Sequence, residues 1–134
     1  MQAHLIIYKG DSVLKSQFVN RSFVIGPSLR CDFTHDFKTW GKTIPLIKRK
    51  AGSFFLYLPL GTRGVVEYKN IKVQIGDLIG IGILPRHGHF HLFELKPNQR
   101  LELFFEDLRF LIQVHAEKVK AEVSKLPRAF KARP

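Results

Sequence analysis

The chain has 134 residues, of which 45% are hydrophobic, so it is long enough for one buried core and too short for two domains of ordinary size. It carries 22 Lys and Arg against 11 Asp and Glu, a formal net charge of +11, and this balance indicates an acidic or polyanionic partner. No apolar run approaches the roughly 18 residues of a membrane-spanning helix, and the single Cys31 excludes an internal disulfide and a cysteine-based zinc site.

Period-two alternation of apolar and polar residues runs through most of the chain and predicts strands. In the segment NIKVQIGD, for example, Ile71, Val73 and Ile75 share one face while the residues between them face water. The segment RLELFFEDLRFLIQV predicts a hairpin whose turn is Glu106-Asp107. The expected strands, in chain order, are 5–8, 12–18, 23–25, 44–48, 54–58, 65–68, 71–75, 78–84, 89–95, 101–105 and 108–114.

Short strands at this spacing predict an all-β chain, with a β-sandwich over residues 1–115. The C-terminal end differs, because HAEKVKAEVSKLP has a spacing that a helix tolerates and is stopped by Pro127. We therefore expect a basic helical or disordered tail over residues 116–134. Lys and Arg gather on the cytoplasmic side of membranes, so this tail would suit a segment just before a membrane span in a longer parent protein.

The start of the chain, MQAHLIIYKGD, has an apolar stretch that is too short for the centre of a secretory signal. We expect the protein in the cytoplasm, at the inner face of the membrane if the tail adjoins a span.

Several motifs, taken together and in order, resemble those of forkhead-associated (FHA) domains. FVIGPSLRCDF resembles their IGR-S-x-x-CD stretch, GSFFLYLPLGTRGVVEYKNIKV their FxLxDLGSxNGTxVNGxxV, and LKPNQRLELFFEDLRFLIQV their final LxxGDxIxIGxxxFxF. The resemblance covers roughly residues 3–114, and VQIGDLIGIG at 73–82 is a competing match for the last motif. It implies an FHA-like β-sandwich of about eleven strands, which the expected short C-terminal helix or tail would follow.

The resemblance also implies recognition of phosphothreonine by loops at one end of the sandwich, through Arg and Ser or Thr donors. Where the first motif has Arg, this chain has Pro27, which has neither a charge nor a backbone N–H. The SRxH motif of these domains aligns with GKTI, residues 41–44. Gly41 replaces the Ser of the motif, Lys42 replaces the Arg and Ile44 replaces the His. The scaffold motifs are present and the phosphate-binding residues are largely replaced.

A substitute peptide- or anion-binding site at the same end is one interpretation of the basic and hydroxyl residues in these loops, and ordinary solvated loop residues are the other. The candidates are Ser28, Arg30, Lys42, Thr43, Thr62 and Arg63.

Three histidines in RHGHFHLF, namely His87, His89 and His91, would lie on one face of a continuous strand, about 6.5 to 7 Å apart. That spacing suits a zinc or copper ion, whereas ordinary edge-strand histidines are the alternative interpretation. We predict no resident metal or cofactor.

Catalysis and nucleic-acid binding have weaker support in the sequence. The glycine turns in LGTRG and GIGILP lack the pattern of phosphate-cradling loops, and no Ser, His and Asp set has a distinguishing spacing. Aromatic residues that could stack on bases follow the core alternation more than a platform pattern; they are Trp40, Phe54, Phe55, Tyr57 and Phe90. We therefore predict that the chain is not an enzyme.

The sequence predicts a non-catalytic interaction or assembly module, a degenerate FHA-like domain of a larger bacterial and membrane-linked regulatory, motility or transport complex. Its expected partner is another protein, acidic or phosphorylated. Two alternatives stay open: a phosphothreonine-peptide-binding domain that uses the substitute basic residues, and a nucleic-acid- or anion-binding module.

Overall fold

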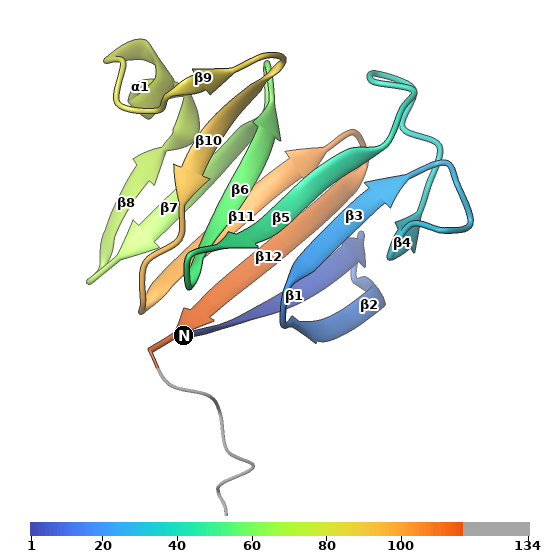
Figure 1. The fold of residues 1–134 in the computed structure, drawn as a ribbon, viewed down its shortest axis with the longest axis horizontal. Helices are drawn as coiled ribbons and strands as arrows, with labels where there is room; N and C mark the ends of the chain where they lie inside the picture. Colours follow the sequence, from blue (N-terminus) through green and yellow to red (C-terminus); the bar gives the residue numbers. More distant parts are fainter. Residues whose placement is uncertain (117–134) are drawn as a thin grey trace, which may run out of the picture.

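In the computed structural model, residues 1–116 form a sandwich of two six-stranded β-sheets (Figure 1). This confirms the predicted all-β sandwich. Apart from Ala116, the predicted tail lies outside the described residues. The elements of residues 1–116 are β1 (Gln2–Lys9), β2 (Ser12–Val19), β3 (Ser22–Gly26), β4 (Phe33–Thr34), β5 (Ile44–Lys50), β6 (Ser53–Pro59), β7 (Arg63–Tyr68), β8 (Ile71–Gln74), α1 (Ile75–Gly80), β9 (Arg86–His87), β10 (Phe90–Glu94), β11 (Gln99–Phe105) and β12 (Leu108–His115).

The first sheet has the strand order β2-β1-β12-β11-β7-β8, and the second has the order β4-β3-β5-β6-β10-β9. Neighbouring strands are antiparallel except β3 and β4. Alternation aims one face of each sheet at a shared core: on β1, Ala3, Leu5 and Ile7 are at most 1% exposed, while the residues between them are half-buried.

The expected strand over 78–84 is wrong, because the chain there forms the end of α1 and a turn. Ile75 is fully buried, and Leu78 and Ile79 pack against the core beside it. Apolar residues spaced by three and four residues are typical of a helix. In the sequence, the glycines on both sides of this segment made the helical spacing hard to recognise. The segment VQIGDLIGIG is thus divided between β8, α1 and the turn after it, while 97–114 supplies the hairpin of β11 and β12.

Within residues 1–116, no helix is both long enough and apolar enough to cross a membrane.

His4 lies on the outer face of the first sheet, where three strands meet. Its Nε2 is 2.9 Å from Ser16 Oγ, and its ring stacks on Phe18 at 4.6 Å between centroids. Burial, and secondarily the charge of His115, lower the pKa of His4 below its ordinary value of 6.5. The unfolded chain therefore binds more protons at this position than the native state as the pH falls through 6.5.

Because of that difference, we expect the free energy of unfolding to decrease when the pH is lowered from about 7.5 to about 5. His4→Gln should flatten this dependence, and His115→Gln, which removes only the neighbouring charge, should flatten it less. Urea unfolding at several pH values measures the slope. An unchanged slope in His4→Gln would contradict the assignment.

Candidate functional site

Four connections meet at one end of the sandwich, which we call the loop end: residues 27–32, 35–43, 60–62 and 88–89. The register brings them together, because Ile25 on β3 pairs with Ile44 on β5, and Pro59 on β6 pairs with Phe90 on β10. Residues 60–62 then cross directly from β6 to β7 in the other sheet. In Figure 1, the end of β6 and the long connection before β5 both lie toward the top of the view.

An aromatic cluster closes the loop end between the sheets. Phe37, in the connection before β5, is fully buried. Its ring centroid lies 6.3 Å from that of Phe105 on β11, and the ring of Trp40 meets Phe105 edge-on at 5.1 Å. Phe105 in turn packs edge-on against Phe110 of β12 at 4.9 Å. We call Phe37, Trp40, Phe105 and Phe110 the aromatic plug, and each edge-on pair contributes about 0.5 to 1.5 kcal/mol beyond its buried area.

Two hydrogen bonds fix the connection that carries Phe37 and Trp40. The Thr39 N–H donates to Glu106 Oε2 at 2.8 Å, which ties this connection to the β11–β12 turn. The Gly41 N–H donates to the Phe37 carbonyl at 2.7 Å. Gly41 has φ +62°, a left-handed conformation that suits glycine. The chain thereby turns toward β5 and places Lys42 and Thr43 beside the plug.

The resulting cleft has a volume of about 240 Å³ and lies beside the aromatic plug. This is smaller than most cofactor sites, and it is large enough for one or two side chains of a bound segment. The apolar part of its lining is Trp40, Ile44, Pro59, Leu60 and Phe90, and the polar part is Thr39, Lys42, Thr43 and His89.

Of the six predicted site residues, Lys42 and Thr43 line this cleft. Ser28 and Arg30 lie in the neighbouring connection between β3 and β4. There Ser28 Oγ accepts a hydrogen bond from the Arg30 N–H at 3.1 Å, and the Ser28 carbonyl accepts one from Thr34 Oγ1 at 3.0 Å. Ser28 is therefore engaged in shaping its own turn.

Thr62 and Arg63 have other surroundings. Thr62 is only 4% exposed, and its Oγ1 donates to the Pro59 carbonyl at 2.6 Å, so its hydroxyl proton is committed inside the β6–β7 turn. Arg63 lines a separate hollow of about 280 Å³ with Gln74 and Phe104. Five of the six candidates thus lie in the loop-end connections, Arg63 begins β7 directly after them, and only two of the six line the cleft.

Gly26 allows the two neighbouring connections to approach each other closely. It has φ +155°, and a Cβ atom at this position would lie 2.9 Å from Thr43 Cα and 3.3 Å from Cys31 Sγ. The Gly26 carbonyl also accepts a hydrogen bond from the His35 N–H at 2.7 Å. A side chain at this position would therefore push Thr43 away from the cleft rim.

The predicted arrangement of the three histidines is wrong. Gly88, at φ +63°, reverses the chain between β9 and β10, as glycine does in two-residue hairpin turns. His87 pairs with Phe90 and His91 pairs with Arg86, so His87 and His91 point to opposite faces and His89 lies in the turn. Among residues 1–116, no three His, Cys, Asp or Glu side chains are grouped as metal ligands would be.

Three of the five aromatic residues considered for base stacking pack against other parts of the chain. Phe54 is 1% exposed and Tyr57 is 5% exposed, and Trp40 packs into the plug. The remaining two, Phe55 and Phe90, do not form a platform by themselves.

Sequence reasoning missed the apolar lining of the cleft, namely Pro59, Leu60 and Phe90 together with Trp40. These four residues come from three segments that are far apart in sequence: the connection 35–43, the end of β6 with the turn after it, and the start of β10. The one local signal was DFKTWG, where two aromatic residues interrupt an otherwise polar connection. Aromatic residues in a polar connection usually pack against the core or a neighbouring segment.

Comparison of the chain with protein-family models, with curated proteins and with solved structures gives no match in any of the three.

We expect Gly26→Ala to lower the free energy of unfolding by roughly 2 to 4 kcal/mol, because it adds a backbone clash to an unfavourable φ. Gly41→Ala is the matched control: its φ is also positive, but the space around it is open, so the loss should be about 1 kcal/mol. Urea unfolding measures both. Equal losses would show that the approach of Thr43 to Gly26 is not tight.

Proposed function

We propose that the chain is a non-catalytic interaction module that holds a short segment of a partner protein in the cleft at the loop end. The observation that carries this proposal is the composition of the cleft: five apolar residues and a rim with one fixed positive charge, Lys42. Such a site suits an apolar side chain of a bound segment with an acidic group beside it.

The cleft is poorly suited to recognise a partner mainly through a phosphate group. A charge-assisted hydrogen bond contributes roughly 1.5 to 3 kcal/mol, so strong phosphate recognition needs several such bonds. Thr62 Oγ1 is already bonded to the Pro59 carbonyl, and Ser28 Oγ accepts from a backbone N–H. Of the six candidate residues, only Lys42 and Thr43 line the cleft, and Lys42 is its only side chain with a fixed positive charge.

The resemblance to FHA domains supports a role in protein interaction, since such modules act inside larger assemblies. The basic composition supports an acidic partner. We place the module in a larger bacterial complex, on the cytoplasmic side of a membrane to which the complex is linked.

A phosphothreonine reader is the second candidate, favoured by one observation: Lys42 and Thr43 stand side by side on the rim, as a cation and a hydroxyl.

The test is a backbone NMR titration with two degenerate peptide libraries that differ only in a central threonine or phosphothreonine. We expect both libraries to shift the amides of residues 39–44, 60 and 89–90, with affinities that differ by less than about tenfold, the effect of one charged contact. Lys42→Ala should weaken binding of both. Lys38→Ala, an exposed residue of the same connection, is the control and should bind as the parent chain does.

Binding of the phosphorylated library alone, at least about a hundredfold tighter, would establish the second candidate instead. No shift with either library at millimolar concentration would contradict peptide binding at this cleft.

A further inference from the structure

The end of the sandwich opposite the cleft is formed by another set of turns. These are the turns at residues 20–21, 51–52 and 69–70 and the connection 95–98, together with the start of β1 and the end of β12. The Leu95 N–H donates to the Phe54 carbonyl and the Asn98 N–H to the Val114 carbonyl, both at 2.9 Å, which holds these segments together. They lie along the lower side of the view in Figure 1.

Positive charge is concentrated at this end, which we call the basic end. Half of the 16 Lys and Arg of residues 1–116 lie in or beside its turns, but only two of the nine Asp and Glu. The cations are Arg21, Lys48, Arg49, Lys50, Lys69, Lys72, Lys96 and Arg100, and the acids are Glu67 and Glu94. An uneven distribution of this kind produces a positive potential over one face of the molecule.

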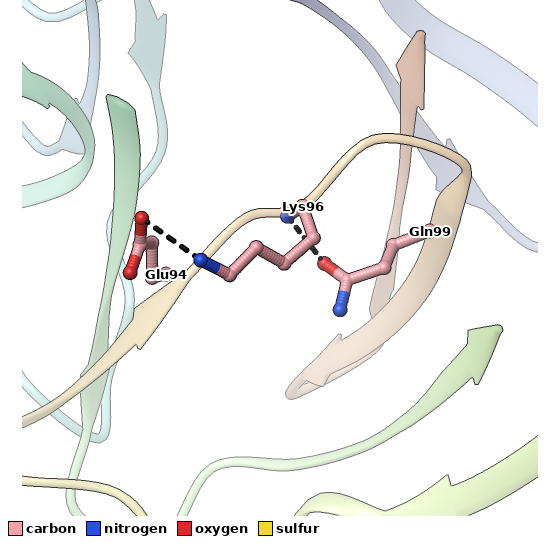
Figure 2. Close-up of polar contacts among 3 residues, drawn as sticks. All are labelled: Glu94, Lys96 and Gln99. Carbon is pink, nitrogen blue, oxygen red and sulfur yellow. Dashed lines mark hydrogen bonds and ion pairs between the residues drawn. The ribbon is translucent and has the colours of Figure 1, made fainter. Parts of the chain in front are cut away.

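One of these cations is neutralised within the structure. Lys96 Nζ lies 3.1 Å from Glu94 Oε2, and the Lys96 N–H donates to Gln99 Oε1 at 2.7 Å (Figure 2). Glu67 lies opposite Lys72 on one neighbouring strand and opposite Arg100 on the other, so one acid faces two cations. The basic end keeps a clear excess of positive charge after these acids are counted.

The cations on β5 are held by aromatic rings, which leave their charge intact. Lys48 Nζ and Lys50 Nζ lie 5.3 Å and 5.9 Å from the centre of the Tyr57 ring. The Arg49 guanidinium lies 5.3 Å from the centre of the Phe54 ring and donates to the Asn20 carbonyl at 3.2 Å. Cation–π contacts orient a charge without neutralising it.

An exposed apolar pair projects at the same end. Tyr68 and Ile71 face each other across the β7–β8 turn and are 40% and 65% exposed. The turn residues Lys69 and Asn70 have φ +51° and +67°, as a tight two-residue hairpin requires. Lys69 Nζ lies 5.3 Å from the Tyr68 ring centre. The tip is thus a tyrosine and an isoleucine flanked by Lys69 and Lys72.

We propose that the basic end docks on an anionic lipid bilayer, with Tyr68 and Ile71 entering the headgroup layer. Tyrosine is favoured at the membrane interface, and lysine side chains reach past apolar neighbours to anionic headgroups. Cations spread over several turns at one end match a charged surface. An exposed isoleucine favours a bilayer over a nucleic acid, because it gains from an apolar environment and cannot stack on a base.

The direction of the chain is consistent with this orientation. Ala116 follows β12 at the basic end, and the sequence from 117 to 134 carries six Lys and Arg against two Glu. With the basic end on the bilayer, the cleft at the loop end faces away from it.

The test is sedimentation of the 134-residue protein with vesicles of phosphatidylcholine alone or with about 30% phosphatidylserine, at about 0.15 M salt. We expect binding to the anionic vesicles only, weakening as salt increases. Each basic residue near an anionic surface contributes roughly fivefold, so Lys69→Asn/Lys72→Gln should bind about 20- to 30-fold more weakly. The control variant Lys15→Ala/Lys38→Ala also removes two positive charges, but from positions away from the basic end. Its affinity for the vesicles should decrease much less.

A second variant separates orientation from general charge attraction. In Tyr68→Trp/Trp40→Phe, vesicles with brominated lipid chains should quench the tryptophan, whereas Trp40 of the parent chain, at the loop end, should stay unquenched. Equal losses in the two double-lysine variants, quenching of Trp40 instead of Trp at position 68, or tight binding to single-stranded DNA without vesicle binding would each overturn the proposal. So would the absence of vesicle binding by a protein that circular dichroism shows to be folded.

Discussion

The docking of Phe37 and Trp40 onto Phe105 decides the shape of the loop end. Without it, the connection 35–43 would have no apolar attachment to the first sheet, and the pairing of Ile44 with Ile25 would fix only the end of this connection. Phe37 is fully buried and the Thr39 N–H is bonded to Glu106, so packing and polar contacts hold the same segment. The cleft beside Lys42 and Thr43 is therefore part of the folded framework.

Much of the fold could be predicted because period-two alternation of apolar and polar residues shows directly which face of a strand is buried. Ala3, Leu5 and Ile7 show this on β1. The prediction failed where the chain changes period or direction over a few residues. Ile75, Leu78 and Ile79 form a single helical turn among glycines, and Gly88 reverses a segment that otherwise resembles one strand.

The candidate site was less predictable than the fold. The sequence could place Lys42 and Thr43 at this end of the sandwich because their position follows from motif order. Thr62 has the right residue type, but its hydroxyl caps the turn after Pro59, and a sequence does not reveal which partner a hydroxyl chooses. The apolar lining comes from connections that only the sheet register brings together. The two ends also differ in chemistry: the loop end offers an apolar cleft with one cation, and the basic end offers a charged surface.

The central claim is that the aromatic plug holds the connection 35–43 in place. Amide hydrogen exchange, combined with proton–proton NOEs in the free protein, tests it most directly. The account predicts slow exchange at the Thr39 and Gly41 amides and NOEs from the Phe37 and Trp40 rings to Phe105. Exchange of both amides at the rate of an unstructured chain, with no NOEs between these rings, would contradict it.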